Sequence, residues 1–127
     1  MIDVLKFEKQ YEDLISKIPD YEVPPSEAKE LATKFFKATF EINKVIRIIR
    51  NDIILLEQTS KVLYKQAIEN SEGKNITEKK VNAEANIQYL KGLKELQEHS
   101  NSLEYFRGLF KIMEQGHIFY KGISLDK

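Results

Sequence analysis

Apolar residues recur at intervals of three and four along most of the chain, which is the spacing that places them on one face of an α-helix. The first such stretch covers residues 2–18. The segment that follows, residues 19–25, contains three prolines. Proline lacks an amide donor and biases the residue before it away from helical geometry, so the first helix cannot continue through this segment. We therefore predict a short N-terminal helix over residues 1–18.

A second and much longer stretch runs from residue 26 to residue 70 and contains neither proline nor glycine. Its first residue, Ser26, is of a type that commonly caps a helix N-terminus. About forty residues at roughly 1.5 Å each give a rod of roughly 65 Å, which exceeds the width of a compact domain of this size. We predict one long helix here, with apolar positions at Leu31, Phe35, Ala38, Ile42, Ile46, Ile49, Ile53, Leu56, Leu63 and Ala67.

A polar turn at residues 71–75 separates this helix from a third amphipathic stretch. Thr77 is the expected N-cap, and the predicted helix covers residues 77–115, with Gly116 as its stop. The polar cluster at residues 99–102 is the place where we expect a kink or break. Residues 116–127 form a short apolar tail that we expect to dock on its own hairpin or on another subunit.

These elements predict an all-α protein. It consists of a long antiparallel helical hairpin with a short N-terminal helix before it and a short C-terminal segment after it. At 127 residues the chain fits a single domain. A hairpin of this length has more apolar face than the first helix covers, so we expect a homo-oligomer, and a monomeric three-helix bundle is the alternative. The residues assigned to subunit contacts are Phe106, Phe110, Ile118, Phe119 and Tyr120.

The amino-acid composition narrows the possible classes of protein further. Hydrophobic residues make up 42% and charged residues 31% of the chain, which is typical of a folded helical protein rather than a disordered one. Cysteine is absent, which excludes disulfides and thiolate zinc sites and fits a reducing compartment. Neither a basic leader with an apolar run nor a stretch of about 20 apolar residues is present. We therefore expect a cytoplasmic location and no membrane partner.

The formal net charge is zero, but the charges are distributed unevenly. Residues 1–30 contain eight acidic residues against four lysines, and residues 31–65 contain seven bases against three acids. At about 100° per residue, five bases of the second predicted helix fall within about 120° of arc. Such a stripe is typical of any solvated helix face, and it also fits a surface that follows a phosphate backbone. The stripe consists of Lys44, Arg47, Arg50, Lys61 and Lys65. Aromatic residues do not add to it, because Phe35, Phe36 and Phe40 lie where we expect core.

Catalytic and metal-binding signatures do not emerge from the sequence. Glu95 and His99 have ligand-like spacing on one helix, but a carboxylate-bridged metal site needs a second such pair on another helix, and the sequence offers none. A phosphate-binding glycine loop, a zinc-protease motif and a nucleophile elbow are also missing. We therefore predict that the protein is not an enzyme and uses no cofactor.

The layout of residues 40–123 resembles that of phage recombination mediator proteins of the UvsY type. The resemblance is carried by apolar positions of the third predicted helix, by Gly116, by the aromatic and basic run 118–121, and by Tyr64 and Gly73 around the turn. The apolar positions are Ala83, Ile87, Leu90, Tyr105, Phe106, Leu109, Phe110 and Ile112.

This resemblance implies a ring-like homo-oligomer that binds single-stranded DNA and helps to load a recombinase in place of the single-strand binding protein. It places the DNA contacts on Lys44, Arg47, Arg50, Lys61 and Lys65. One departure is that family members tend to have more lysine and arginine just before the turn. At that place this chain has no basic residue, its sequence being Leu56, Glu57, Gln58, Thr59 and Ser60. The alternative is a helical viral structural, adaptor or protein-interaction subunit that binds no nucleic acid, with the stripe facing an acidic partner surface.

Overall fold

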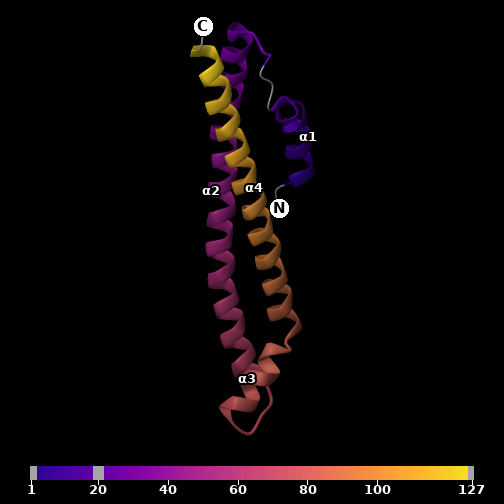
Figure 1. Ribbon diagram of the computed structural model, residues 1–127. Coiled ribbons are helices and arrows are strands. Elements are labelled where there is room, and N and C mark those ends of the chain that lie inside the picture. The colour runs from indigo at the N-terminus through magenta and orange to yellow at the C-terminus, as the bar shows by residue number, and fades with distance from the viewer. Residues whose placement is uncertain (1–2, 19–21, 126–127) are drawn as a thin grey trace. The chain divides into compact units, whose positions relative to one another are not determined.

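The computed structural model describes residues 3–18 and 22–125, and it is all-α over these residues. Four helices follow one another along the chain (Figure 1). They are α1 at Val4–Ile15, α2 at Pro25–Asn70, α3 at Ile76–Glu84 and α4 at Ile87–Leu125. The predicted fold class is confirmed, with a long helix pair, α2 and α4, and a short N-terminal helix.

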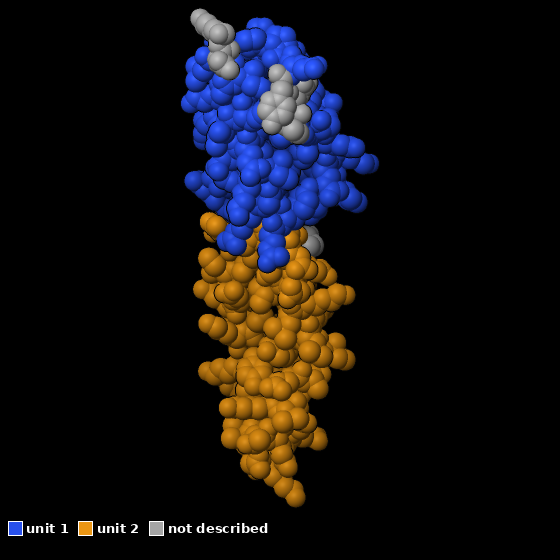
Figure 2. Space-filling model, viewed as in Figure 1, with its two compact units in different colours: residues 1–47, 104–127 blue, residues 48–103 orange. Residues whose placement is uncertain are grey.

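Contacts divide the chain into two compact units (Figure 2). Unit 1 contains residues 1–47 and 104–127, and unit 2 contains residues 48–103. Helices α2 and α4 both contribute to both units. Unit 1 therefore contains the first part of α2 and the last part of α4, and unit 2 contains the remaining part of each.

Helix α1 is shorter than predicted and begins at a capping residue. The side chain of Asp3 accepts a hydrogen bond from the backbone N–H of Lys6 at 3.3 Å, which satisfies one of the free amides of the first turn. The helix ends at Ile15 rather than at residue 18. Part of the predicted break, residues 19–21, lies outside the described residues.

Helix α2 matches the long helix expected from the sequence, but Ser26 is not its cap. The helix begins at Pro25, and the N–H of Ala28 donates to the carbonyl of Pro24 at 2.9 Å. Proline is favoured at the first helical position because its fixed φ suits the helix. Its lack of an N–H costs nothing there, since an N–H at that position has no acceptor within the helix.

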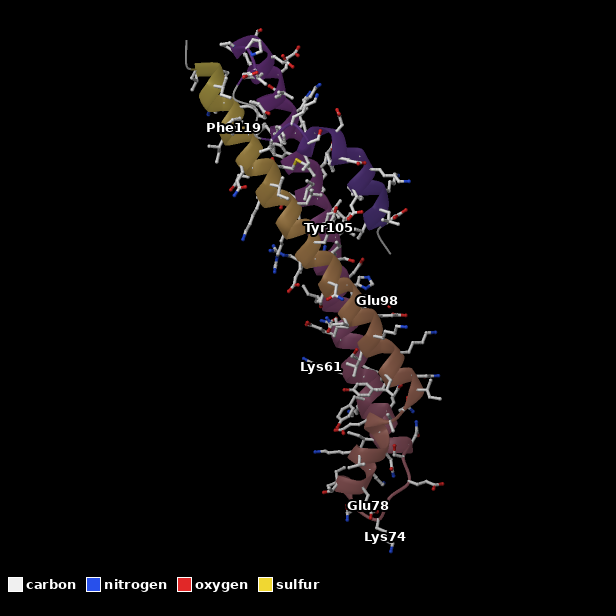
Figure 3. The ribbon with its side chains drawn as sticks, turned by 45° about the vertical axis from the view of Figure 1, so that its right-hand side comes forward. Lys61, Lys74, Glu78, Glu98, Tyr105 and Phe119 are labelled. Carbon is white, nitrogen blue, oxygen red and sulfur yellow. The ribbon has the colours of Figure 1, made fainter. Side chains whose placement is uncertain are left out.

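The third predicted helix is two helices, and the break lies at residues 85–86 rather than in the cluster 99–102. The N-cap of α3 is Asn75, not Thr77, and its side chain accepts from the N–H of Glu78 at 3.0 Å. Figure 3 labels Glu78 beside Lys74 at the turn, where the Lys74 N–H donates to the Glu78 carboxylate at 2.7 Å. Asn86 caps α4 by accepting from the N–H groups of Gln88 and Tyr89. Asn75 therefore starts α3 after the turn, and Asn86 starts α4 after the break.

Gly116 does not end a helix, contrary to the sequence prediction, because α4 continues through it to Leu125. Gly116 is instead a close-packing position against the ring of Phe35. The predicted short C-terminal segment is therefore the last turns of α4, up to the last described residue.

Unit 1 has a well-filled core between α1, the first part of α2 and the last part of α4. Rings from all three helices meet there: Phe7 lies 5.1 Å from Phe106, and Phe35 lies 5.7 Å from Tyr120, measured between centroids. The hydroxyl of Tyr11 donates to the carboxylate of Glu41 and ties α1 to α2. The fully buried large side chains of this unit are Phe35, Ile42, Phe106, Met113 and Tyr120.

Unit 2 has a much thinner core. Its buried apolar residues are Ile49, Ala67 and Ala83, and its two buried polar residues are Ser60 and Ser102. The rings of Tyr64 and Tyr89 lie 5.0 Å apart and join α2 to α4 within this unit. Large apolar side chains remain exposed on it at Ile48, Ile54, Leu55, Val62, Ile76, Val81, Ile87, Leu90 and Leu93. Unit 2 therefore leaves apolar surface that its own helices do not cover.

Among the described residues, none of the helices combines the length and the apolar character that crossing a membrane requires.

Candidate nucleic-acid interface

The five bases predicted to contact nucleic acid all lie on α2, and all are exposed. Lys44 and Arg47 belong to unit 1, whereas Arg50, Lys61 and Lys65 belong to unit 2. Figure 3 labels Lys61 on α2. Within residues 3–18 and 22–125, none of the five forms an ion pair shorter than 4.0 Å. Their positive charges are therefore available to a ligand.

Two phenylalanines of unit 1 are exposed where the sequence led us to expect core. Phe35 is fully buried as expected, but the exposed fractions of Phe36 and Phe40 are 46% and 58%. The rings of Phe36 and Phe40 pack edge to face, with 5.0 Å between centroids. Two adjacent exposed aromatic rings keep a large apolar area in water, which is typical of a surface that has a binding partner.

These phenylalanines share one side of α2 with a row of bases. At about 100° per residue, the members of this row fall within about 100° of arc. We call this surface the aromatic-basic face and define it as Lys29, Phe36, Lys37, Phe40, Lys44 and Arg47. All six side chains are exposed. The same arc between residues 29 and 47 contains no acidic residue, because Glu30 and Glu41 fall outside it.

A hollow of about 360 Å³ lies beside Phe36 at the edge of this face. Helix α2 contributes Lys29 to its lining, and α4 contributes His117 and Lys121. The His117 ring lies 5.0 Å from the Phe36 ring, and its Nδ1 lies 3.0 Å from the carbonyl oxygen of Ala32. That contact fixes the imidazole against α2, so the hollow combines two aromatic ring systems with lysines.

The arrangement suits a strand of nucleotides with unpaired bases. Exposed aromatic rings offer faces on which bases stack, and flanking lysine and arginine side chains neutralise phosphates. The face extends over about 27 Å of helix from residue 29 to residue 47. A base in a duplex is already stacked and paired, so stacking on Phe36 and Phe40 requires a single strand.

Sequence reasoning found Lys44 and Arg47 but missed Lys29, Lys37 and the two phenylalanines. The signal was present, since Phe36, Phe40, Lys44 and Arg47 follow one another at intervals of four, four and three residues. It was masked because Phe35 and Phe36 are adjacent, and periodicity alone does not decide which of two neighbouring apolar residues turns inward.

None of the comparisons with protein-family models, with curated proteins and with solved structures gave a match. The interpretation of this surface therefore depends on its own geometry and chemistry.

The residues assigned to subunit contacts are not all on the surface. Phe106 and Tyr120 are fully buried in the core of unit 1, so they support their own chain's fold. Phe110 and Phe119 are half-buried, and Ile118 is 63% exposed. Figure 3 labels Phe119 on α4. Of the five, Ile118 has the largest exposed fraction.

Ligand clusters for a metal ion are not found in the described part of the chain: no group of three or more histidine, cysteine, aspartate or glutamate side chains converges there. Of the two residues with ligand-like spacing, His99 makes a local contact, its Nδ1 lying 2.9 Å from the Glu95 backbone carbonyl oxygen.

Proposed function

We propose that this protein binds single-stranded DNA through the aromatic-basic face of α2, without catalysing a reaction. The observation that carries the proposal is the exposed Phe36–Phe40 ring pair in helical register with Lys44 and Arg47. Stacking of a nucleobase on an aromatic ring contributes about 1–3 kcal/mol. The lysine and arginine side chains supply a salt-dependent attraction to phosphates. Arg50, Lys61 and Lys65 are proposed as further phosphate contacts on unit 2.

The proposed biological role is that of a recombination mediator that assists recombinase loading in the cytoplasm. Support comes from the resemblance of the sequence layout to mediator proteins of the UvsY type, together with the all-α helix pair. Gly116, one of the residues that carry the resemblance, lies inside α4 and not at a break. In such a role the protein meets a recombinase or a single-strand binding protein on the same strand.

We further propose that the protein works as a homo-oligomer. Nine large apolar residues of unit 2 are exposed, and a soluble helical pair gains stability when a partner covers such surface. A helical structural or adaptor subunit is the second candidate function, because the same exposed residues suit protein assembly without DNA.

Fluorescence anisotropy with a labelled oligothymidylate tests the DNA-binding proposal. Phe36→Ala with Phe40→Ala is expected to weaken binding at least tenfold, because about 1.4 kcal/mol corresponds to a factor of ten and two stacking faces are removed. Ile87→Ala with Leu90→Ala removes exposed apolar side chains elsewhere and is expected to leave binding unchanged. Equal affinities for the wild-type and Phe36/Phe40 variants would contradict the proposal.

A further inference from the structure

The hollow beside Phe36 has the charge of an anion site. It lies in unit 1, where the last turns of α4 run beside the first turns of α2 (Figure 1), and its volume is about 360 Å³. Two exposed lysines line it from the two helices, Lys29 from α2 and Lys121 from α4. Of the described residues that line the hollow, none is acidic. Two positive charges around one small hollow attract an anion.

The hydroxyl groups of the hollow have no hydrogen to offer an anion. The hydroxyl of Thr33 donates to the backbone carbonyl of Lys29 at 3.1 Å, and the hydroxyl of Ser124 donates to that of Lys121 at 2.8 Å. Each hydroxyl has a single hydrogen, so both oxygens can only accept further bonds. Among the lining side chains, the groups left to donate to an anion are therefore the two ammonium groups and the ring of His117.

The contact of His117 with α2 determines which of its ring nitrogens is free. Nδ1 lies 3.0 Å from the carbonyl oxygen of Ala32, and a carbonyl oxygen only accepts, so Nδ1 carries the hydrogen. Within the part of the chain that the structure describes, Nε2 has no hydrogen-bond partner. In the neutral ring Nε2 presents a lone pair, which repels a phosphate oxygen. In the protonated ring Nε2 is a charged N–H donor, and Nδ1 keeps its bond to α2.

The charged groups around His117 come from both helices that line the hollow. Helix α2 contributes Lys29 and α4 contributes Lys121. Glu114 precedes His117 by three residues on α4, but it does not line the hollow, and no ion pair within 4.0 Å joins the two among the described residues. A phosphate in the hollow stabilises the charged ring, so proton and phosphate each strengthen the binding of the other.

We propose that this hollow is a phosphate subsite of the aromatic-basic face, and that protonated His117 completes it. Lys29 and Lys121 supply two ammonium groups at neutral and acidic pH, and Nε2 of His117 supplies a third charged donor only at mildly acidic pH. The ligand is a phosphodiester of the single strand whose nucleobase stacks on Phe36, the ring of which lies 5.0 Å from the His117 ring. The inference rests on the proposed DNA binding and adds the pH range in which the strand is held most tightly.

The direction of the pH effect follows from the charge of the ring. Histidine is the side chain whose charge ordinarily changes between about pH 5 and 8, whereas carboxylates and lysines keep their charge over most of that range. As pH falls the ring gains a positive charge and a donor, so the affinity for DNA rises; as pH rises both are lost. We expect about fivefold tighter binding at about pH 5.5 than at about pH 7.5, as for one ion pair at a partly exposed site.

Fluorescence anisotropy of oligothymidylate binding at these two pH values tests the subsite. The oligonucleotide has hydroxyl groups at both ends, because a terminal phosphate would itself titrate near pH 6. The chain has only two histidines, His99 and His117, and each lies with Nδ1 against a backbone carbonyl oxygen, so replacing each with asparagine gives a matched pair. Asparagine is neutral at both pH values, and its amide can donate to the same carbonyl.

The two variants are expected to differ at acidic pH alone. His99→Asn should keep the fivefold gain, because His99 belongs to unit 2 and does not line the hollow. His117→Asn should bind as tightly as the wild type at about pH 7.5 and lose the gain at about pH 5.5. The salt dependence of binding should be steeper at the lower pH in the wild type and in His99→Asn, and not in His117→Asn, because a charged contact with phosphate releases counterions.

The outcomes separate this inference from the proposed function. A His117→Asn protein that keeps the gain, or a His99→Asn protein that loses it, would overturn the subsite. Wild-type affinity that is equal at the two pH values would also overturn it and needs no variant, so the test stays decisive if circular dichroism shows His117→Asn to be unfolded. DNA binding that does not change with pH leaves the proposed function standing, whereas absence of binding at both pH values contradicts the proposed function and the subsite together.

Discussion

Gly116 of α4 packs directly against the ring of Phe35 of α2. A Cβ atom at Gly116 would lie 2.6 Å from both Cδ1 and Cε1 of that ring, closer than real carbon atoms approach. Phe35 is fully buried and stacks on Tyr120, so its ring has little freedom to move aside. The close approach of the two helices in unit 1 therefore depends on the missing side chain.

Two identical substitutions on α4 are expected to have opposite effects on stability. Gly116→Ala should lower the free energy of unfolding by about 1–3 kcal/mol, because overpacking a filled core forces side chains or backbone to shift. Gly108→Ala should raise it by up to about 1 kcal/mol, because alanine is the better helix former and the added methyl meets no neighbour. Urea denaturation of the two variants checks the pair. Equal effects would show that Gly116 is not a packing contact.

The stability of unit 1 is expected to fall at alkaline pH through Tyr11. Burial raises the pKa of Tyr11, and the hydrogen bond it donates to Glu41 raises it further. The neutral phenol is thus favoured in the folded state, and its contribution is complete below the unfolded pKa of about 10. As pH rises above about 10, the unfolded chain releases this proton first and stability declines.

Tyr11→Phe tests this assignment. It removes the hydrogen bond and is expected to cost about 1–2 kcal/mol at neutral pH, because a bond to a carboxylate is stronger than a neutral one. Above about pH 10, the free energy of unfolding should fall less steeply with pH in Tyr11→Phe than in the wild type. Thermal melting followed by circular dichroism measures both. Parallel stability profiles for the two proteins would disprove the role of Tyr11.

The salt dependence of DNA binding is expected to show that Lys44 and Arg47 contact phosphates. Each phosphate contact on a single strand contributes about −0.7 to the slope of log K against log salt. Lys44→Ala with Arg47→Ala should therefore reduce the magnitude of that slope by about 1.4. Lys94→Ala with Lys111→Ala removes the same charge from α4 and should leave the slope nearly unchanged. A similar slope change in both pairs would indicate a general charge effect instead of contacts at this face.

Periodicity predicted the helical class, the long α2 and the approximate place of the turn. It failed where a single residue has two possible roles. Glycine is a residue type expected at a helix end, but Gly116 lies within α4. A glycine is needed there because a larger side chain would collide with the Phe35 ring. Asn86 accepts two backbone N–H groups and starts α4, an effect that apolar spacing does not reveal.

The candidate site was predictable in part. The charge stripe placed Lys44 and Arg47 on an exposed face of α2, and these two residues remain in the proposed interface. Phe36 and Phe40 were expected in the core because the number of helices packing on α2 is not encoded in its own pattern. In unit 1, α4 packs on Phe35 through Gly116 and Tyr120 and leaves its neighbour Phe36 exposed.

The central claim is that bases stack on Phe36 and Phe40, and tryptophan fluorescence tests it most directly. The chain contains no tryptophan, so Phe36→Trp and Phe40→Trp each introduce a single reporter at the face, and Ile87→Trp introduces a control reporter on exposed surface of unit 2. On titration with oligothymidylate, the reporters at positions 36 and 40 should be quenched to saturation at the concentration where anisotropy reports binding, while the reporter at position 87 changes little. Unquenched reporters at both phenylalanine positions, in a protein that binds the oligonucleotide, would contradict the account.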